Sequence, residues 1–176
     1  MTVDEQDFDR MVTIHYPRIR RAALLLSNGN AWDADDLAQE TLLQAALGWS
    51  RFHATSSTAT WLYSILLNQH RQRQRLARRL WRRWLSWFER NPRDQSAVRP
   101  ESHLVTEEWR TSLWSAVALL PEPQREAVVL RYAEGMAYHE IAQLLGCPIG
   151  TVKSRLHHAL ESLHRELAEP ELAKPE

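Results

Sequence analysis

The chain of 176 residues is long enough for one domain or two small ones, and 44% hydrophobic residues suffice for a core. Only 5 glycines argue against an all-β fold with many tight turns, and a single cysteine, Cys147, excludes a disulfide framework. The formal net charge of +0 means that any binding to nucleic acid has to come from charge gathered in separate segments. Neither a membrane-length apolar run nor a signal peptide is visible, so we expect a soluble, cytoplasmic protein.

In the first fifty residues, the apolar residues follow the spacing of α-helices. Apolar residues over 8–26 recur at intervals of three and four, which predicts one or two amphipathic helices, with Pro17 either kinking one helix or opening a second. The polar run SNGN at 27–30 predicts a break. Asp33 is a plausible N-cap for a further helix that continues to about Trp49.

The charge changes sign along the chain. Residues 51–59 are rich in Ser and Thr and predict a loop, and a third helix should start near Thr60. Residues 70–93 then hold nine arginines against Glu89 alone, whereas the first fifty residues are mainly acidic. This segregation of charge is what a neutral protein needs in order to bind nucleic acid.

The segment 91–102 contains two prolines and no apolar periodicity, so we interpret it as a linker between two domains. Thr106 should open a helix that Pro121 ends, and another helix should follow over 124–133. The apolar residues of the first of these helices are Trp109, Leu113, Trp114, Val117 and Leu120. No strand pattern appears in the chain, which predicts an all-α fold.

The most informative stretch is the end of the chain. Residues 136–145 predict a short amphipathic helix, Gly146 supplies the left-handed residue of a helix C-terminus, and Pro148 suits the first turn of a second helix. The second helix carries apolar residues at Val152, Leu156, Leu160 and Leu163. Its opposite face is polar and basic, unlike the alternating Glu and Lys of a merely solvated helix. The pattern indicates a helix-turn-helix for duplex DNA, with a plain helical hairpin as the alternative.

Three motifs in order give the chain a resemblance to a known family. They are DADDLAQETLLQA (33–45), TWLYSILLNQ (60–69) and LPEPQREAVVLRYAEGMAYHEIAQLLGCPIGTVKSRLHHAL (120–160). The sequence resembles bacterial RNA polymerase sigma factors of the sigma-70 class, and among them the compact extracytoplasmic-function (ECF) group. The resemblance covers nearly the whole chain. It implies two small helical domains: a four-helix-like, sigma-2-like domain over 1–90, a flexible linker over 91–105, and a sigma-4-like helix-turn-helix domain over 106–170.

The resemblance also implies function and partners. A sigma factor carries out no covalent chemistry itself, so we expect no enzyme activity, no cofactor, no metal and no small-molecule substrate. The expected partners are the RNA polymerase core, through the clamp coiled coil of its β′ subunit and through its β subunit, promoter DNA, and an anti-sigma factor. The expected function is promoter selection at minus-ten and minus-thirty-five elements, with help in melting the start region.

The polymerase-docking helix has four candidate residues at i, i+3, i+4 and i+7, a spacing that puts them on one helix face: Asp36, Gln39, Glu40 and Leu43. The resemblance implies that this face binds the β′ clamp. The alternative is a solvated acidic face that stabilises a helix N-terminus. A metal site built from Asp33, Asp35 and Asp36 is disfavoured, because no glycine-punctuated calcium loop follows.

The resemblance further implies a pocket for a base flipped out of the minus-ten element, between the loop 52–59 and the helix that starts at Thr60. The candidate DNA contacts there are Phe52, Ser56, Ser57, Trp61, Asn68, Arg71, Arg73 and Arg75. Asn68 suits hydrogen bonding to a base edge, and the arginines suit phosphates. Trp61 is more typical of a helix core than of a base contact. The chain departs from the family in having Thr58 and Ala59 where a bulky apolar residue is common.

For the minus-thirty-five element the candidates lie on the second helix of the helix-turn-helix: Thr151, Lys153, Ser154, Arg155 and His158. Arg155 suits a bidentate contact to guanine, and Lys153 suits phosphate. The nearby histidines complete no metal-ligand set and are interpreted as surface residues. Cys147 is either a sensor of oxidants or, more simply, a small structural residue.

The segment LWRRWLSWFER (80–90) combines an apolar stripe with arginines at its margins. Such a helix suits a membrane surface, the space between two domains, or a protein partner, and we favour the protein partner. Two other functions compete with the sigma factor. A dimeric helix-turn-helix regulator would leave the docking and melting motifs without a role. A hydrolase built on Asp33, Asp35 and Asp36 has no histidine beside that cluster.

Overall fold

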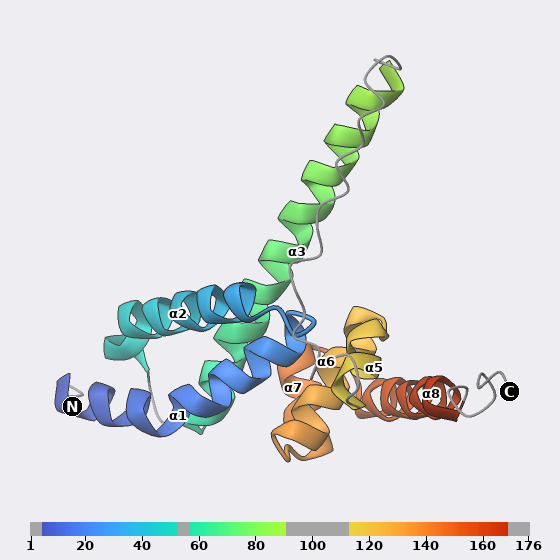
Figure 1. Ribbon diagram of the computed structural model, residues 1–176. Helices are drawn as coiled ribbons and strands as arrows, with labels where there is room; N and C mark the ends of the chain where they lie inside the picture. The colour runs from blue at the N-terminus through green and yellow to red at the C-terminus, as the bar shows by residue number, and fades with distance from the viewer. Residues whose placement is uncertain (1–4, 53–56, 91–112, 169–176) are drawn as a thin grey trace, which may run out of the picture.

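The computed structural model describes residues 5–52, 57–90 and 113–168, and within these ranges all regular structure is helical (Figure 1). The predicted all-α class is therefore confirmed for the described residues. Ser56, the expected linker 91–105 and the expected helix start at Thr106 lie outside them, as do the side chains of 84–90.

The N-terminal part, residues 5–90, contains α1 (Glu5–Leu26), α2 (Ala31–Gly48), the 3₁₀ turn η1 (Trp49–Arg51) and α3 (Thr58–Arg90). The expected four-helix-like domain is wrong for the described residues, which form three helices. Pro17 lies inside α1, so the first helix is continuous. Apolar faces of the three helices meet in a core that includes Ile19, Leu37 and Leu66. Burying each such side chain stabilises the fold by about 1.5–3 kcal/mol.

The turn between α1 and α2 decides where α2 begins. Asn28 and Gly29 have φ of 57° and 78°, and the Gly29 N–H donates to the Leu24 carbonyl at 2.9 Å, which ends α1. Asn30 then has the extended backbone of an N-cap, and its side chain accepts from the Asp33 N–H at 3.2 Å. The prediction of Asp33 as the N-cap is therefore wrong: Asp33 already lies in the first helical turn.

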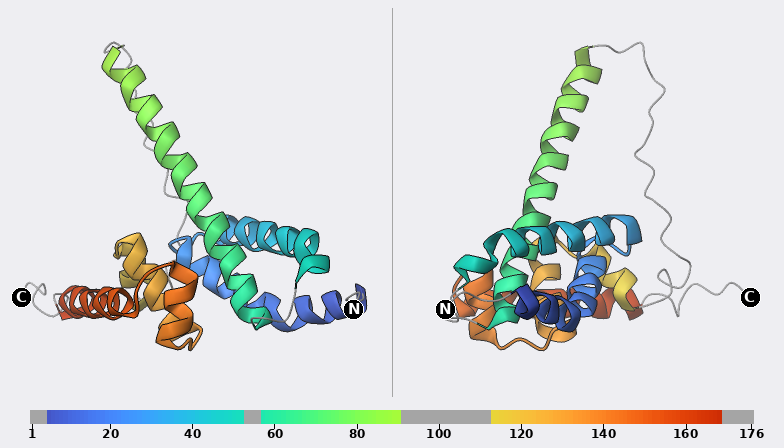
Figure 2. Two further views of the ribbon diagram at one scale, coloured as in Figure 1. Left: turned by 180° about the vertical axis from the view of Figure 1, so that it is seen from behind. Right: turned by 90° about the vertical axis from the view of Figure 1, so that its left-hand side faces the viewer.

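Helix α3 has two different halves. Its first half is buried in the fold through Leu62, Tyr63, Leu66 and Leu67. Its second half extends away from the other helices (Figures 1 and 2). Leu76 and Leu80 are more than half exposed there.

The C-terminal part, residues 113–168, contains α5 (Leu113–Leu119), α6 (Glu122–Val128), a single π-helical turn η2 (Val129–Ala133), α7 (Tyr138–Leu145) and α8 (Ile149–Ala168). The prediction of the apolar face of α8 contains one error. Leu160 is 46% exposed, whereas Ala159 is fully buried. At about 100° per residue, position 159 stays within about 20° of Val152, and position 160 turns about 80° away from it.

The helix-turn-helix has the predicted turn. Gly146 adopts φ 62° and ψ 41° after α7, and the Cys147 N–H donates to the Ala142 carbonyl at 3.1 Å. The carbonyl of Pro148 accepts the first hydrogen bonds of α8, from Thr151 at 2.9 Å and Val152 at 3.2 Å. The left-handed residue is therefore what allows α8 to start directly after α7.

Replacing Gly146 with Ala should lower the free energy of unfolding by about 1 kcal/mol, because an L side chain is strained at this φ. The matched control is Gly150→Ala in α8, where an added Cβ meets nothing within 4 Å and φ is not positive. That change should be neutral or stabilise by about 0.5 kcal/mol. Urea denaturation measures both, and equal effects of the two changes would contradict the argument.

Candidate functional site

Three of the four predicted docking residues lie on the solvent side of α2: Asp36, Gln39 and Leu43 are exposed. Two apolar residues that the sequence analysis missed lie on the same half of the helix. Trp32 is 82% exposed and Leu47 is 68% exposed. The outer face of α2 therefore combines a carboxylate with an apolar row, a composition typical of contact surfaces.

The fourth predicted docking residue, Glu40, lies at the margin of that face and is paired with α3. Its Oε2 accepts from Arg73 Nη2 at 2.9 Å and from Nε at 3.0 Å. Arg73 also donates to the Asp33 carbonyl at 3.3 Å. A half-exposed pair of this kind contributes about 0–1 kcal/mol. Arg73, predicted to contact phosphates, is thus directed toward α2.

An aromatic cluster lies where α3 begins. The rings of Phe52 and Trp61 have centroids 4.8 Å apart, and Trp49, which the sequence analysis missed, stacks on Phe52 at 5.6 Å. A groove of about 220 Å³ runs beside Trp61. It is lined by Thr60, Trp61, Ser64 and Asn68 of α3, and by Gln143 and Leu144 of α7. Trp61 is half-buried, so it belongs both to the core and to the groove wall.

Ser57 has a structural role in the same region. Its hydroxyl accepts from the Thr60 N–H at 3.1 Å and lies 2.8 Å from the Thr60 hydroxyl, so it caps α3. Asn68, in contrast, is exposed along the groove. Of these polar residues, Asn68 therefore has the side chain that is better placed to meet a base edge.

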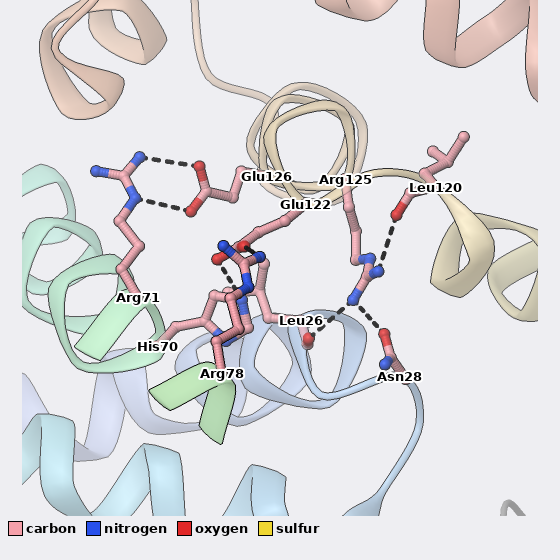
Figure 3. Close-up of polar contacts among 9 residues, drawn as sticks. All are labelled: Leu26, Asn28, His70, Arg71, Arg78, Leu120, Glu122, Arg125 and Glu126. Atoms are coloured by element: carbon pink, nitrogen blue, oxygen red, sulfur yellow. Dashed lines mark hydrogen bonds and ion pairs between the residues drawn. The ribbon is translucent and has the colours of Figure 1, made fainter. Parts of the chain in front are cut away.

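The predicted phosphate-binding arginines of α3 differ in their contacts. Arg71 donates twice to Glu126 of α6, at 2.8 and 2.9 Å, and this pairing raises the pKa of Arg71 (Figure 3). Arg75 is exposed and has no partner among the described residues. Two of the three predicted arginines, Arg71 and Arg73, are thus bound within the protein.

On α8, Lys153, Ser154 and His158 are exposed, as a DNA-facing helix requires. Arg155 is half-buried, with its Nη1 3.8 Å from Cys147 Sγ. It lines a pocket of about 310 Å³ to which α3 contributes three further arginines. Thr151 is half-buried at the helix start. The predicted base-reading arginine therefore faces α3, and the other polar residues face solvent.

Comparison with known proteins matches the N-terminal and C-terminal parts to two separate family regions. Residues 11–83 match the family description Sigma-70 region 2, and residues 110–163 match Sigma-70 region 4. A relative from Rhodopseudomonas palustris named ECF RNA polymerase sigma factor EcfG is 38% identical over 147 residues, covering 84% of this chain and 77% of the relative. The chain belongs to the ECF sigma factors of the sigma-70 family. Members of this family are transcription initiation factors.

Other relatives of this ECF sigma factor agree. RNA polymerase sigma-H factor from Pseudomonas aeruginosa is 29% identical, covering 93% of this chain and 88% of the relative. Among solved structures, the sigma factor RpoE in complex with the anti-sigma factor NepR from Bartonella quintana matches with a TM-score of 0.73 at 29% identity, over 93% of this chain and 98% of that one. CnrH in complex with the cytosolic domain of CnrY matches with a TM-score of 0.66 at 25% identity, over 94% and 90%.

The two parts of this ECF sigma factor contact each other through buried charges that the sequence analysis missed. Glu134, directly after η2, has a side chain with 0% exposure. Its carboxylate accepts from Arg18 Nε at 3.1 Å, from Arg21 Nη2 at 3.1 Å and from the Tyr63 hydroxyl. Burial and this hydrogen bond raise the pKa of Tyr63 well above its ordinary value. Sequence gives no local signal for such a cluster, because the donors lie 71 to 116 residues before Glu134 in the chain.

Arg125 forms a second buried contact between the parts. Its guanidinium donates to the Leu26 carbonyl at 3.3 Å, to the Asn28 side chain, and to the Leu120 carbonyl at 2.8 Å (Figure 3). Burial lowers the pKa of Arg125, although Glu122 attracts its charge. The end of α1 is thereby joined to α6.

In the described part of the chain, no helix is long and apolar enough to cross a membrane. Within the same residues, no group of three or more His, Cys, Asp or Glu side chains is placed to hold a metal ion.

His70 makes the stability of this arrangement depend on pH. The side chain is buried, and its Nε2 lies 3.7 Å from Glu122 Oε1. Burial lowers the pKa of His70, and the positive charges of Arg125 and Arg71 lower it further. The negative charges of Glu122 and Glu126 act in the opposite direction. Below about pH 6.5 the unfolded chain therefore takes up a proton that the folded chain resists. The free energy of unfolding should thus fall as pH decreases from about 7 to 5.5.

The variant His70→Gln should flatten this decline, as measured by urea denaturation at several pH values. His164→Gln removes an exposed histidine of α8 and serves as the control, with the wild-type pH dependence expected. An unchanged profile in His70→Gln would assign the decline to other groups.

Proposed function

We propose that this chain binds the RNA polymerase core and directs DNA-templated transcription initiation at promoters with a minus-ten and a minus-thirty-five element. One observation carries the proposal. The residues that match the family motifs form three surfaces of different chemistry, an acidic and apolar face on α2, an aromatic groove at the start of α3, and a polar, basic face on α8. Covalent chemistry belongs to the polymerase core, and the chain supplies docking, promoter contacts and help in melting.

Docking uses the outer face of α2. The exposed carboxylate of Asp36 suits a basic partner such as the β′ clamp coiled coil, and it steers the encounter. Trp32, Leu43 and Leu47 supply apolar area that loses contact with water on binding. Glu40 contributes only if it exchanges Arg73 for a group on the polymerase.

Melting uses the groove beside Trp61. A base that leaves the minus-ten duplex loses stacking worth a few kcal/mol, and stacking on an aromatic side chain returns about 1–3 kcal/mol. The partly exposed ring of Trp61 and its neighbour Phe52 offer that stacking surface. The exposed amide of Asn68 can then pair with the edge of the base.

Upstream recognition uses α8 as the helix in the major groove. Lys153 and Ser154 suit phosphates and base edges, Thr151 and His158 lie along the same helix, and Arg155 suits guanine. The domain boundaries that we propose for these roles are 1–90, with a linker over 91–105, and 106–170.

An anti-sigma factor is the proposed regulator. The support comes from the two solved structures above, in which a similar sigma factor is bound to NepR and another to the cytosolic domain of CnrY. A dimeric regulator that binds operators by itself is the alternative function, and it would leave the exposed face of α2 without a role.

The test of the function is specific initiation in vitro by the polymerase core together with this protein. We expect it to require both components, and tight operator binding by a dimer without core would contradict it. The variant Asp36→Arg with Leu43→Glu should weaken core binding at least about tenfold while the helical content is unchanged. Asp9→Arg, which reverses an exposed carboxylate on α1, is the control and should bind core normally.

Arg155→Ala should reduce discrimination at one position of the minus-thirty-five element. A bidentate contact with guanine is worth about 1–3 kcal/mol, or roughly a fivefold to 150-fold preference. The discrimination is measured by letting promoters that differ by a single base pair compete for the holoenzyme. Lys153→Ala is the comparison and should weaken all sequences alike. Uniform weakening by Arg155→Ala would assign Arg155 to phosphate instead.

A further inference from the structure

Four arginines from two helices line one pocket. Three of them, Arg71, Arg75 and Arg78, are spaced i, i+4 and i+7 along α3, so they share one face of that helix. Figure 3 shows two of these side chains, Arg71 and Arg78, beside α6. Arg155 of α8 adds the fourth guanidinium.

The size and charge of the pocket suit a small anion. Its volume of about 310 Å³ lies at the lower end of the range for small-molecule sites. Its other polar or charged lining residues are Gln74, Glu122 and Glu126. Two carboxylates meet four guanidinium groups, so the lining has an excess of two positive charges. A concave surface with one sign of charge in excess raises the local concentration of ions of the opposite sign.

The two carboxylates do not use up the hydrogen-bond donors of the arginines. Glu126 accepts from Nε and Nη2 of Arg71, at 2.8 and 2.9 Å. Glu122 accepts from Nη2 of Arg78. Each guanidinium has five N–H donors, so even these paired arginines keep donors for another acceptor.

The other two arginines have no carboxylate partner among the described residues. Arg75 is exposed, whereas the half-buried Arg155 has its Nη1 3.8 Å from Cys147 Sγ, which is a weak acceptor. Because Arg75 belongs to α3 and Arg155 to α8, an anion that binds both has to accept hydrogen bonds from more than one direction. A carboxylate matches one guanidinium fork, whereas the tetrahedral oxygens of a phosphate can reach several.

We propose that this pocket binds a small phosphorylated molecule, whose phosphate group accepts hydrogen bonds from Arg75 and Arg155. A phosphate monoester carries a charge of about −1.5 to −2 at pH 7 and has three acceptor oxygens, which matches both the excess charge and the unused donors. Arg71 and Arg78 supply further donors while they stay paired with α6. The site goes beyond the proposed function, because binding there requires neither polymerase nor DNA.

The experiment is isothermal titration calorimetry of the full chain in a buffer free of phosphate, at ~0.15 M NaCl to screen diffuse attraction. The probes are inorganic phosphate, pyrophosphate and ADP, with citrate as the carboxylate comparison. We expect one site per chain and citrate binding at least about tenfold weaker than the best phosphate probe. Tightest binding of an inorganic probe assigns the pocket to inorganic phosphates, and tightest binding of ADP assigns it to nucleotides. No binding of any phosphate probe, or equal binding of citrate, overturns the inference.

Arg75→Gln and Arg155→Gln test whether binding takes place in this pocket. Each removes one guanidinium that lacks a carboxylate partner, and each should weaken phosphate binding about tenfold or more. Arg165→Gln makes the same change of charge at an exposed position about 15 Å further along α8 and should bind as the wild type does. Equal weakening by Arg155→Gln and Arg165→Gln would mean diffuse attraction to positive charge and would overturn the site.

Glu122→Gln tests the pocket in the opposite direction. The change removes a negative charge from the lining and keeps the size of the side chain, so phosphate binding should tighten about threefold or more. Damage to the fold would weaken binding, so such a gain reports the charge of the pocket. Glu166→Gln, at an exposed position on α8, is the control with unchanged binding expected. Unchanged or weaker binding by Glu122→Gln with normal circular dichroism would contradict the proposal.

Discussion

The arrangement of the two parts depends on one buried carboxylate. Glu134 lies in the C-terminal part, yet Arg18, Arg21 and Tyr63, which donate to its carboxylate, belong to the N-terminal part. Removing a carboxylate from water costs several kcal/mol unless charged partners and hydrogen bonds offset it. The side chain is fully buried only because those donors are present. The π-helical turn before it ends with the Glu134 N–H bonded to the Val129 carbonyl, which sets where the carboxylate points.

The need of charged groups for partners also determines the contacts of the basic helix α3. Arg71, Arg73 and Arg78 are paired with Glu126, Glu40 and Glu122, respectively. These three arginines, which the sequence separates from the acids along the chain, each meet an acid in space. The separation of charge along the sequence is thus partly cancelled in space by contacts of α3 with α2 and α6.

Local patterns allowed the helices and much of the site to be predicted. Spacing placed Asp36, Gln39 and Leu43 together on one face of α2, and Gly146 marked the turn, because these features depend on neighbours a few residues away. The N-cap was wrongly assigned to Asp33 instead of Asn30, because both side chains suit the role and only the path of the preceding turn decides. The pairs of Glu126 and Glu134 were beyond sequence reasoning, because no periodicity links residues 55 or 116 positions apart.

Charged groups supply much of the described contact between the two parts. An apolar interface of about 1,600 Å² would expose its surface to water on opening, at about 25 cal/mol per Å², or roughly 40 kcal/mol before other terms. Charged groups behave differently, because water solvates Arg71, Glu126 and Glu134 when the contact breaks, and the desolvation cost of closing nearly cancels the attraction. Matching at several places, at Glu126, Glu134 and Arg125, therefore gives the contact its definite geometry.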